Sequence, residues 1–257
     1  MYKSKKVVVV MPAYNAGKTL LQTYQETMDQ GCVDLVIVVD DASKDNTHEI
    51  AGKLENTVVY RHDTNKGYGA NQKTCYELAL QNGADIVVMV HPDYQYSPKL
   101  IPAMASLIGN DVYECVIGSR ILGGYALDGG MPLWKYISNR FLTLIENFLI
   151  GAKLSEYHSG YRAYSKKLLT KLDLDKFDDD FIFDNEILAQ IVWTGAKVAE
   201  ITCPTKYFAE ASSINFKRCI KYGFGCLRNA VMFRLAKLLK IDTKFFRKEN
   251  RNIFLIQ

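Results

Sequence analysis

The sequence lacks any long apolar run. A helix that spans a bilayer needs about 18 or more apolar residues, and no uncharged run in these 257 residues is that long. The charged start leads straight into Val7–Met11, which is too short for the apolar core of a signal peptide. We therefore expect a cytoplasmic protein that does not cross a membrane unaided but can lie on the inner face of the cell membrane.

Paired cysteines and repeats are also lacking. The six cysteines are scattered and form no C-x-x-C pair, which disfavours a zinc ribbon or a dithiol redox site. The absence of low-complexity runs and fixed-period repeats disfavours disordered and solenoid proteins. With 48% hydrophobic residues, the chain can bury one large α/β core. We expect one main domain.

The net charge of +4 conceals an asymmetry. Residues 214–251 carry eleven Lys and Arg against two Asp and Glu, so the rest of the chain is net negative. A helical pattern runs from Ile214 to about Lys240. One of its faces carries Lys217, Lys221 and Arg228, and the opposite face carries Cys219, Cys226, Ala230 and Phe233. Such a helix suits a membrane surface, or it packs against the domain or a second copy in a homodimer.

Short β-branched runs alternate with helical patterns in the first half of the chain. The predicted strands are Val7–Met11, Leu35–Val39, Val58–Arg61 and Ile86–Val90, and the predicted helices are Thr19–Asp29, Thr47–Leu54 and Ala70–Gln81. This rhythm is typical of an α/β fold with a Rossmann-like, mostly parallel sheet flanked by helices. Further on we expect a strand at Cys115–Ser119, an amphipathic segment at Trp134–Ile150, a turn at Glu156–Arg162, a helix near Phe183–Thr194 and a strand at Lys197–Thr202.

Polar loops follow the first four predicted strands. Ligands of open parallel sheets bind outside the carboxyl ends of the strands. Residues of the first three loops are candidates for binding a nucleotide: Pro12, Ala13, Tyr14, Asn15, Asp40, Asp41, Ser43, Lys66, Gly67, Gly69 and Asn71. Asp40 and Asp41 suit contacts to a base and ribose hydroxyls, or they cap the helix that follows. The two glycines allow a backbone approach and Lys66 can meet a phosphate, although the full dinucleotide fingerprint is missing.

The fourth loop, His91-Pro92-Asp93, places two potential metal ligands at alternate positions. Mg²⁺ or Mn²⁺ held by one or two protein groups and substrate phosphates is the usual arrangement. Asp93 is the stronger ligand candidate. His91 is either structural or a softer ligand that favours Mn²⁺.

Charged side chains near later strands and helices are further candidates. Arg120 and Arg162 match phosphate geometry, and the turn Ser159-Gly160 offers a backbone approach, unless these are ordinary surface charges. Asp184 and Glu186 open a helix, where they act as first-turn charges or as a base that deprotonates an acceptor hydroxyl.

In this order, six motifs make the chain resemble glycosyltransferase family 2, with its GT-A fold, and within it the dolichol-phosphate mannose synthases and bacterial polyprenyl-phosphate glycosyltransferases. The motifs are VVMPAYN (9–15), VVDDASKDNT (38–47), NKGYGAN (65–71), DYQYSP (93–98), IGSR (117–120) and SGYRAY (159–164). The likeness covers about residues 5–210. It implies a GT-A domain at 1–212, with a donor half to about 120 and an acceptor half from 121, and a basic helical extension at 213–257.

The resemblance implies an inverting displacement at an anomeric carbon, assisted by a divalent cation. Asp93 and Gln95 fall on the metal-site motif, and Asp41 would hold the nucleotide. The base pocket would be lined by Pro12, Tyr14 and Asn15, and Arg120, Ser138 and Arg162 would face phosphates or acceptor. The sequence departs from the pattern twice: His91 replaces the first aspartate of Asp-x-Asp, and Glu156 stands where similar enzymes place an aspartate.

Three hypotheses follow for the reaction, none with a nucleic-acid partner. The first is transfer of a hexose from a UDP- or GDP-linked donor to a polyprenyl phosphate, which is already anionic and needs no base. The second is transfer to a hydroxyl of a saccharide or lipid-linked glycan in cell-envelope polysaccharide synthesis, with Asp184 or Glu186 as base. The third is a nucleotide-sugar-binding protein without turnover.

Overall fold

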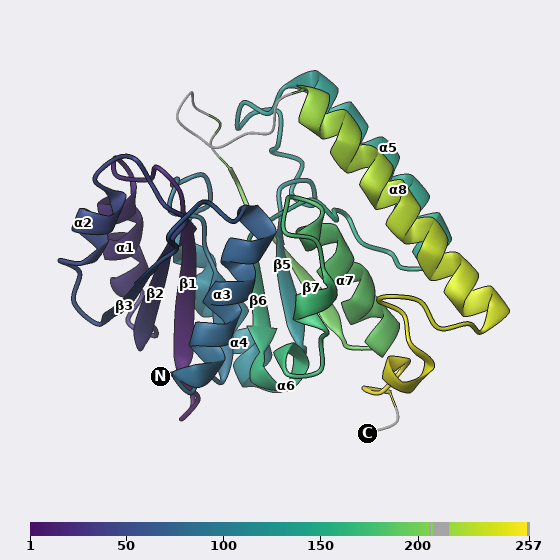
Figure 1. Cartoon of the computed structure of the whole chain (residues 1–257), viewed down its shortest axis with the longest axis horizontal. Helices are drawn as coiled ribbons and strands as arrows, with labels where there is room; N and C mark the ends of the chain where they lie inside the picture. The colour runs from purple at the N-terminus through teal and green to yellow at the C-terminus, as the bar shows by residue number, and fades with distance from the viewer. Residues whose placement is uncertain (206, 208–215, 256–257) are drawn as a thin grey trace.

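A mostly parallel β-sheet forms the centre of the molecule (Figure 1). The structure is a computed structural model that describes residues 1–205, 207 and 216–255. Within these residues the sheet has seven strands in the order β3-β2-β1-β4-β6-β5-β7. The strands are β1 (Val7–Ala13), β2 (Leu35–Asp40), β3 (Thr57–Arg61), β4 (Ile86–Met89), β5 (Cys115–Ser119), β6 (Arg162–Ser165) and β7 (Val198–Thr202). Only β6 runs antiparallel to its neighbours, β4 and β5.

Helices cover both faces of this sheet (Figure 1). They are α1 (Leu20–Met28), α2 (Thr47–Ala51), α3 (Tyr68–Gln81), α4 (Ile101–Gly109), α5 (Leu133–Ile150), α6 (Lys166–Leu169), α7 (Phe183–Thr194) and α8 (Phe216–Leu239), with short 3₁₀ turns at Pro98–Leu100, Leu174–Lys176 and Lys248–Asn250. The period of two in β1 divides the core. Val8 and Val10 pack toward α3 and α7, whereas Val7 and Val9 pack toward α1 and α4.

The predicted α/β architecture is confirmed, with differences at some elements. All predicted strands and helices of the first half are present, with bounds shifted by a few residues. The predicted turn Glu156–Arg162 ends where β6 begins, so the chain re-enters the sheet there instead of only turning. The predictions also omit α4, which connects β4 to β5. Among the described helices, none combines the length and apolar character that a membrane crossing requires.

The C-terminal helix α8 packs along α5 (Figure 1). Its predicted start at Ile214 and the side chain of Lys217 lie outside the described residues. Cys226, Ala230 and Phe233 are buried, while Lys221 and Arg228 are exposed. The predicted amphipathic character is therefore confirmed for the described part of α8.

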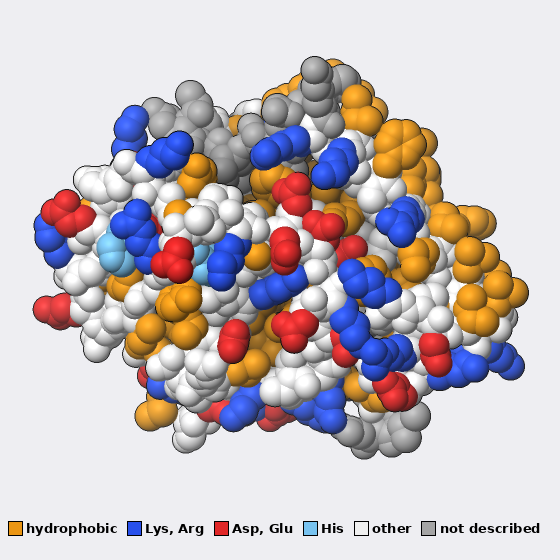
Figure 2. Space-filling model, viewed as in Figure 1, with side chains coloured by type: hydrophobic (Ala, Val, Ile, Leu, Met, Phe, Trp, Pro, Cys, Tyr) orange, Lys and Arg blue, Asp and Glu red, His pale blue; other side chains and the backbone are white. Residues whose placement is uncertain are grey.

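One side of the α5–α8 pair is exposed to solvent and hydrophobic. We call it the apolar face; it consists of Leu133, Trp134, Ile137, Phe141, Leu144 and Phe148 of α5 with Ile220, Phe224, Val231, Leu235, Leu238 and Leu239 of α8. Figure 2 shows hydrophobic side chains gathered along this edge of the molecule. A patch of this kind on a folded protein marks a site of interaction with a protein or a membrane.

Candidate active site

The loops at the carboxyl ends of β1 to β4 surround a cavity of about 800 Å³, which we call the sheet-edge cavity. Eight predicted nucleotide-binding residues line it: Pro12, Ala13, Tyr14, Asn15, Asp41, Lys66, Gly67 and Asn71. The sequence did not predict that the segment Asp178–Phe181 and Arg218 would complete the wall. The predicted rim of polar loops therefore encloses a space large enough for a small-molecule ligand.

Asp41 connects two of these loops. Its Oδ1 accepts a hydrogen bond of 2.8 Å from the Lys66 N–H, and its Oδ2 accepts one of 3.0 Å from the Gly67 N–H. His62 Nδ1 lies 2.7 Å from Asp41 Oδ1 on the other side. With 2% of its surface exposed, Asp41 fixes the position of Lys66 at the cavity as well as lining the wall. His62 was not predicted, although it directly follows β3.

The adjacent Asp40 and Ser43 do not line the cavity, which corrects the prediction that they contact a nucleotide. Asp40 is fully buried. Its Oδ1 accepts from the Ser43 N–H at 3.0 Å, and its Oδ2 lies 3.3 Å from Arg61 Nε. The Ser43 hydroxyl accepts from the Asn15 N–H at 2.8 Å. Both side chains therefore shape the loop before α2. The alternative that the aspartates cap this helix is not confirmed, because the N-cap of α2 is Asn46 and its side chain makes no capping hydrogen bond.

The two glycines of the third loop allow its backbone to pack closely against residues 178–179. Gly67 has φ +101°, and a Cβ there would lie 2.6 Å from the Asp179 carbonyl oxygen. A Cβ on Gly69 would lie 2.5 Å from the Asp178 carbonyl oxygen. Gly69 does not line the cavity, so its predicted approach to a ligand is corrected to an approach to residues 178–179. Asn71 does line it, and its Oδ1 has no hydrogen-bond partner in the described part of the chain.

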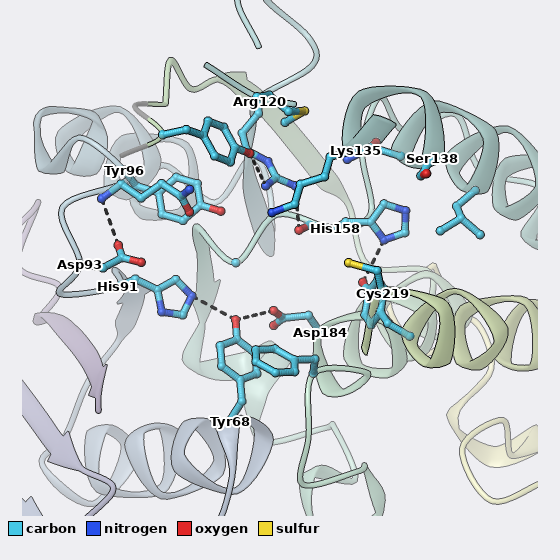
Figure 3. A pocket seen from close by; sticks show the side chains of 18 of the residues that line it. Tyr68, His91, Asp93, Tyr96, Arg120, Lys135, Ser138, His158, Asp184 and Cys219 are labelled. Carbon is cyan, nitrogen blue, oxygen red and sulfur yellow. Dashed lines mark hydrogen bonds between the residues drawn. The ribbon is translucent and has the colours of Figure 1, made fainter. Parts of the chain in front are cut away.

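A second cavity of about 210 Å³, which we call the helix cavity, lies between the sheet and the α5–α8 pair (Figure 3). Among the predicted residues, Asp93, Gln95, Arg120, Ser138, Gly160 and Asp184 line it. The unpredicted residues include Lys135 and Asn139 of α5, His158, Tyr207, and Tyr222 of α8. Except for Tyr207, which comes five residues after β7, these positions follow no parallel strand, so the loop rule that located the first cavity gave no signal for them.

The two cavities meet at Asp93, His91 and Tyr68, which line both. The Tyr68 hydroxyl donates to Asp184 Oδ2 at 2.6 Å and lies 3.0 Å from His91 Nε2 (Figure 3). Because the hydroxyl proton goes to Asp184, a neutral His91 must donate from Nε2 to Tyr68. Its Nδ1 then keeps a lone pair and can serve as a ligand.

Asp93 lies in a tight turn next to this junction. Its Oδ1 accepts from the Gln95 N–H at 3.0 Å, and the intervening Tyr94 has φ +59°. Asn15 and Ala42 in the neighbouring loops also adopt positive φ, at +52° and +57°. Such backbone is strained for residues other than glycine and often occurs at functional sites.

One carboxylate and one imidazole at this junction suit a divalent cation only if a ligand supplies further oxygens. In the described ranges, no group of three His, Cys, Asp or Glu side chains gathers as a complete metal site. Asp93 and His91 fit an ion shared with the phosphates of a substrate, which is a common arrangement for Mg²⁺ and Mn²⁺. Both candidate ligands thus line the junction of the two cavities, and metal binding by them stays a prediction.

Arg120 is held at the wall of the helix cavity by Glu156. Its Nε donates to Glu156 Oε1 at 2.8 Å, its Nη2 donates to the same oxygen, and its Nη1 donates to the Tyr207 hydroxyl at 3.0 Å. Burial acts to raise the pKa of the Glu156 carboxyl, but the charge and hydrogen bonds of Arg120 outweigh it and the pKa is lowered. The longer acid at position 156 thus reaches a partner, and it fixes the guanidinium beside the cavity.

Two other predicted site residues, Arg162 and Ser159, lie away from the cavities. Arg162 is fully buried and donates to the carbonyl oxygens of Tyr157, Ser159 and Asp184 at 2.9, 2.8 and 2.6 Å. Ser159 is also fully buried and donates to the Gly118 carbonyl oxygen. These two residues hold the turn before β6 against β5 and α7, which corrects their predicted contact with phosphate or acceptor.

Glu186 faces a different space. It lines a cavity of about 320 Å³ under α8, apart from the junction of the other two cavities. Its Oε2 accepts from the Asp178 N–H at 2.7 Å, and burial raises the pKa of its carboxyl. The predicted role of Glu186 as a base is therefore wrong on position, whereas Asp184 lines the helix cavity.

Comparison with known proteins places this geometry in a family. The model of glycosyl transferase family 2 matches residues 8–173. A UDP-N-acetylglucosamine–dolichyl-phosphate N-acetylglucosaminyltransferase of Methanococcus voltae is 29% identical over 91% of this chain and 98% of its own. An undecaprenyl-phosphate mannosyltransferase of Micrococcus luteus is 27% identical over 76% of this chain and 82% of its own.

Solved structures agree with the fold. The glucosyl-3-phosphoglycerate synthase of Mycobacterium tuberculosis in complex with UDP superposes with a TM-score of 0.68 at 18% identity, over 90% of this chain and 80% of its own. The same synthase with Mn²⁺, UDP-glucose and phosphoglyceric acid gives a TM-score of 0.66 at 17% identity, over the same shares of the two chains. This likeness confirms the predicted GT-A fold. Together with the match to the family model, it establishes that the chain belongs to glycosyl transferase family 2 and is a glycosyltransferase.

Proposed function

We propose that this enzyme transfers a hexose from a nucleoside diphosphate sugar to a polyprenyl phosphate at a membrane surface. The observation that carries the proposal is the meeting of two cavities at Asp93, with Arg120 and Lys135 on the wall of the helix cavity, which is the acceptor side. The M. voltae and M. luteus relatives, whose names include dolichyl phosphate and undecaprenyl phosphate, support the same acceptor class. The donor then occupies the sheet-edge cavity, and its reacting carbon lies at the junction.

On the donor side, Asp41 and the loops of β1 to β3 hold the nucleoside, and Lys66 lies close to the diphosphate. The name of the M. voltae relative favours a UDP-linked donor over a GDP-linked one. Asp93 and His91 hold a divalent cation together with the diphosphate. When bound, the cation offsets the negative charge that develops on the departing nucleoside diphosphate, and the imidazole ligand favours Mn²⁺ over Mg²⁺.

On the acceptor side, Arg120 and Lys135 supply positive charge to the helix cavity. A phosphate acceptor is already an anion at neutral pH, so its oxygen can attack the anomeric carbon without a general base. Approach from the helix cavity opposes departure into the sheet-edge cavity, which supports an inverting displacement. Asp184 accepts hydrogen bonds from Tyr68 and Gln72, and we assign it a positioning role.

The apolar face supplies the contact with the membrane. It lies on the same two helices that wall the helix cavity, so the tail of a lipid acceptor can leave the cavity directly into the bilayer. A helix pair with a broad apolar side binds the interface in proportion to the area that it buries, and basic side chains add attraction to anionic lipid. Arg140 and Arg228, both exposed, can provide that attraction.

The test is a transfer assay with purified protein, Mn²⁺ and a panel of UDP- and GDP-sugars. Three acceptors are compared: a short-chain polyprenyl phosphate, the matching polyprenol and a soluble oligosaccharide. We expect product with the phosphate and none with the polyprenol. Transfer to the oligosaccharide, lost on Asp184→Asn, would replace this proposal with a base-assisted transfer to a hydroxyl.

A further inference from the structure

A buried polar chain lies behind the helix cavity and connects four parts of the fold. Glu146 of α5 is fully buried, and its Oε1 accepts from Asn185 Nδ2 of α7. Its Oε2 lies 3.3 Å from His158 Nε2. Neither of these two atoms has a hydrogen-bond partner within the part of the chain that the structure describes. His158 Nδ1 lies 2.9 Å from the hydroxyl of Tyr222 on α8.

Burial fixes the charge state of this chain. It raises the pKa of the Glu146 carboxyl to about 8, against the opposing effects of Asn185 and Arg162. It lowers the pKa of the His158 imidazole to about 4, although the charge of Glu156 acts in the other direction. At neutral pH the pair is thus a carboxylic acid and a neutral imidazole, not an ion pair. A proton on Glu146 Oε2 can be donated to His158 Nε2, and this one hydrogen bond gives both atoms a partner.

The position of that proton decides which groups donate and which accept in the hydrogen bonds from Glu146 through His158 to Tyr222. With Glu146 as donor, His158 Nε2 is the acceptor and the ring hydrogen must be on Nδ1. The Nδ1–H then donates to the Tyr222 oxygen. The proton of the Tyr222 hydroxyl is left to point away from His158. Cys226, one turn along α8 and in contact with this hydroxyl, is a weak acceptor. Tyr222 also lines the helix cavity. An anionic oxygen of a ligand bound there accepts a hydrogen bond much more strongly than the thiol of Cys226 does.

Resting on the proposed function, we infer that Tyr222 donates a hydrogen bond to the phosphate of the acceptor, and that Glu146 and His158 are positioning residues that aim its hydroxyl proton into the helix cavity. Arg120 and Lys135 supply charge to the same cavity. Tyr222 would add a directed neutral donor. The helix α8 thereby contributes a binding residue as well as a wall.

The hydrogen bonds between Glu146, His158 and Tyr222 should also reverse their direction when Glu146 loses its proton. A Glu146 carboxylate takes the ring hydrogen on Nε2, so Nδ1 becomes an acceptor and draws the Tyr222 proton away from the cavity. The titratable groups around Glu146 are Arg162 of β6, Tyr157 and His158 of the turn, and Tyr222 and Cys226 of α8, while α7 presents the neutral Asn185. Burial raises the pKa of Tyr157, Tyr222 and Cys226. Glu146 is then the member of this group that titrates near pH 8.

The experiment measures steady-state transfer with purified full-length enzyme, UDP-sugar, Mn²⁺ and short-chain polyprenyl phosphate in detergent. For Tyr222→Phe we expect the acceptor KM to rise about tenfold or more, because a hydrogen bond to a charged group is lost. The donor KM should stay unchanged. Glu146→Leu should raise the acceptor KM similarly, and Glu146→Leu/Tyr222→Phe should be no worse than Tyr222→Phe alone. In contrast to Glu146→Leu, Glu146→Gln should keep the acceptor KM at the wild-type value, because the glutamine amide can donate to His158 Nε2 at any pH.

A pH series separates positioning from a merely structural role. The wild-type acceptor KM should rise above about pH 8, and that of Glu146→Gln should not. UDP binding and thermal midpoints of each variant show that the fold persists. An unchanged acceptor KM in Tyr222→Phe, or a raised acceptor KM in Glu146→Gln, would overturn the inference. A wild-type enzyme that does not use polyprenyl phosphate would instead overturn the proposed function.

Discussion

The hydroxyl of Tyr68 donates a hydrogen bond of 2.6 Å to Asp184, and so joins the first turn of α3 to the first turn of α7 across the junction of the two cavities. The same oxygen lies 3.0 Å from His91 Nε2. Partners of this kind orient a ligating imidazole and select which ring nitrogen carries hydrogen. Tyr68 therefore orients the imidazole of His91, which we propose as a metal ligand.

Tyr68→Phe should weaken metal binding more than it weakens nucleotide binding. We expect the Kd of Mn²⁺ in the presence of UDP to rise about tenfold or more, in the range found for lost partners of metal ligands. Isothermal titration calorimetry measures it directly. As a control, Tyr60→Phe removes the hydroxyl of an exposed tyrosine in β3 and should leave Mn²⁺ binding unchanged. Equal Mn²⁺ affinity in wild type and Tyr68→Phe would show that His91 does not bind the ion.

Asp93→Asn should strongly reduce the rate of transfer, and His91→Asp should change the preferred metal. Loss of the carboxylate at 93 removes the stronger ligand, so we expect turnover to fall about a hundredfold or more. A second carboxylate at 91 replaces a softer ligand with a harder one and should raise the rate with Mg²⁺ relative to Mn²⁺. The exposed Asp63 provides a matched control as Asp63→Asn. The idea fails if His91→Asp leaves the Mg²⁺ to Mn²⁺ rate ratio unchanged.

Glu156→Gln should destabilise the fold at neutral pH by about 3 kcal/mol, because the guanidinium of Arg120, whose side chain is only 13% exposed, loses its charge partner. The lowered pKa of Glu156 means that this ion pair contributes stability above the ordinary glutamate pKa of 4.5. That contribution is lost as the pH falls through the lower, folded-state value. Urea unfolding from pH 7 down to pH 3 should show this acid loss in wild type. Glu156→Gln should lack that component.

Glu146 should make wild type less stable as the pH rises. Its pKa is raised in the folded state, so the folded protein holds a proton that the unfolded chain releases above about pH 4.5, and stability falls until about pH 8. Between pH 4 and 6.5 the lowered pKa of His158 has the opposite effect. From pH 6.5 to 8 we expect wild type to lose up to about 2 kcal/mol relative to Glu146→Gln, at 1.36 kcal/mol per pH unit. Parallel stability curves in that interval would contradict a protonated Glu146.

Charges on the apolar face should release the enzyme from lipid. Phe141→Glu/Phe148→Glu should reduce binding to vesicles of phosphatidylcholine and phosphatidylserine by at least tenfold in a sedimentation assay, because two large exposed rings become charged. Leu21→Glu is the matched control, since Leu21 is exposed on α1, far from this face in the sequence. If wild type is a dimer that the double substitution separates, with vesicle binding unchanged, the face is an interface between two copies.

The sequence predicted the sheet and the edge where the first cavity lies, because β-branched runs and the loops after them are local patterns. The local pattern alone could not distinguish Asp40 from Asp41, although the family resemblance assigned only Asp41 to the nucleotide. One is the last residue of β2 and is buried, and the next directs its carboxylate to the third loop. That difference depends on which side of the sheet each residue faces. Adjacent residues of the same type give no signal for it.

Arg120 and Arg162 show a second limit. Both were predicted to face phosphate, and both lie at strand ends. Arg162 begins a central antiparallel strand and is enclosed by three carbonyl groups, whereas Arg120 follows a strand and reaches a cavity. The predicted turn Glu156–Arg162 included the first residue of β6, and no strand was predicted directly after it, so this distinction was missed. Lys135, His158 and Tyr222 were missed because α5, the turn and α8 come together only through tertiary packing.

The placement of Tyr222 on α8 has a consequence for the order in which the enzyme becomes competent. All four loops of the sheet-edge cavity lie before residue 94, but its wall also includes Arg218, and the wall of the helix cavity includes Tyr222, both on α8. During synthesis, the loops of the sheet can therefore form early, whereas neither cavity is enclosed until α8 has been made. The donor side and the acceptor side become complete at the same late stage.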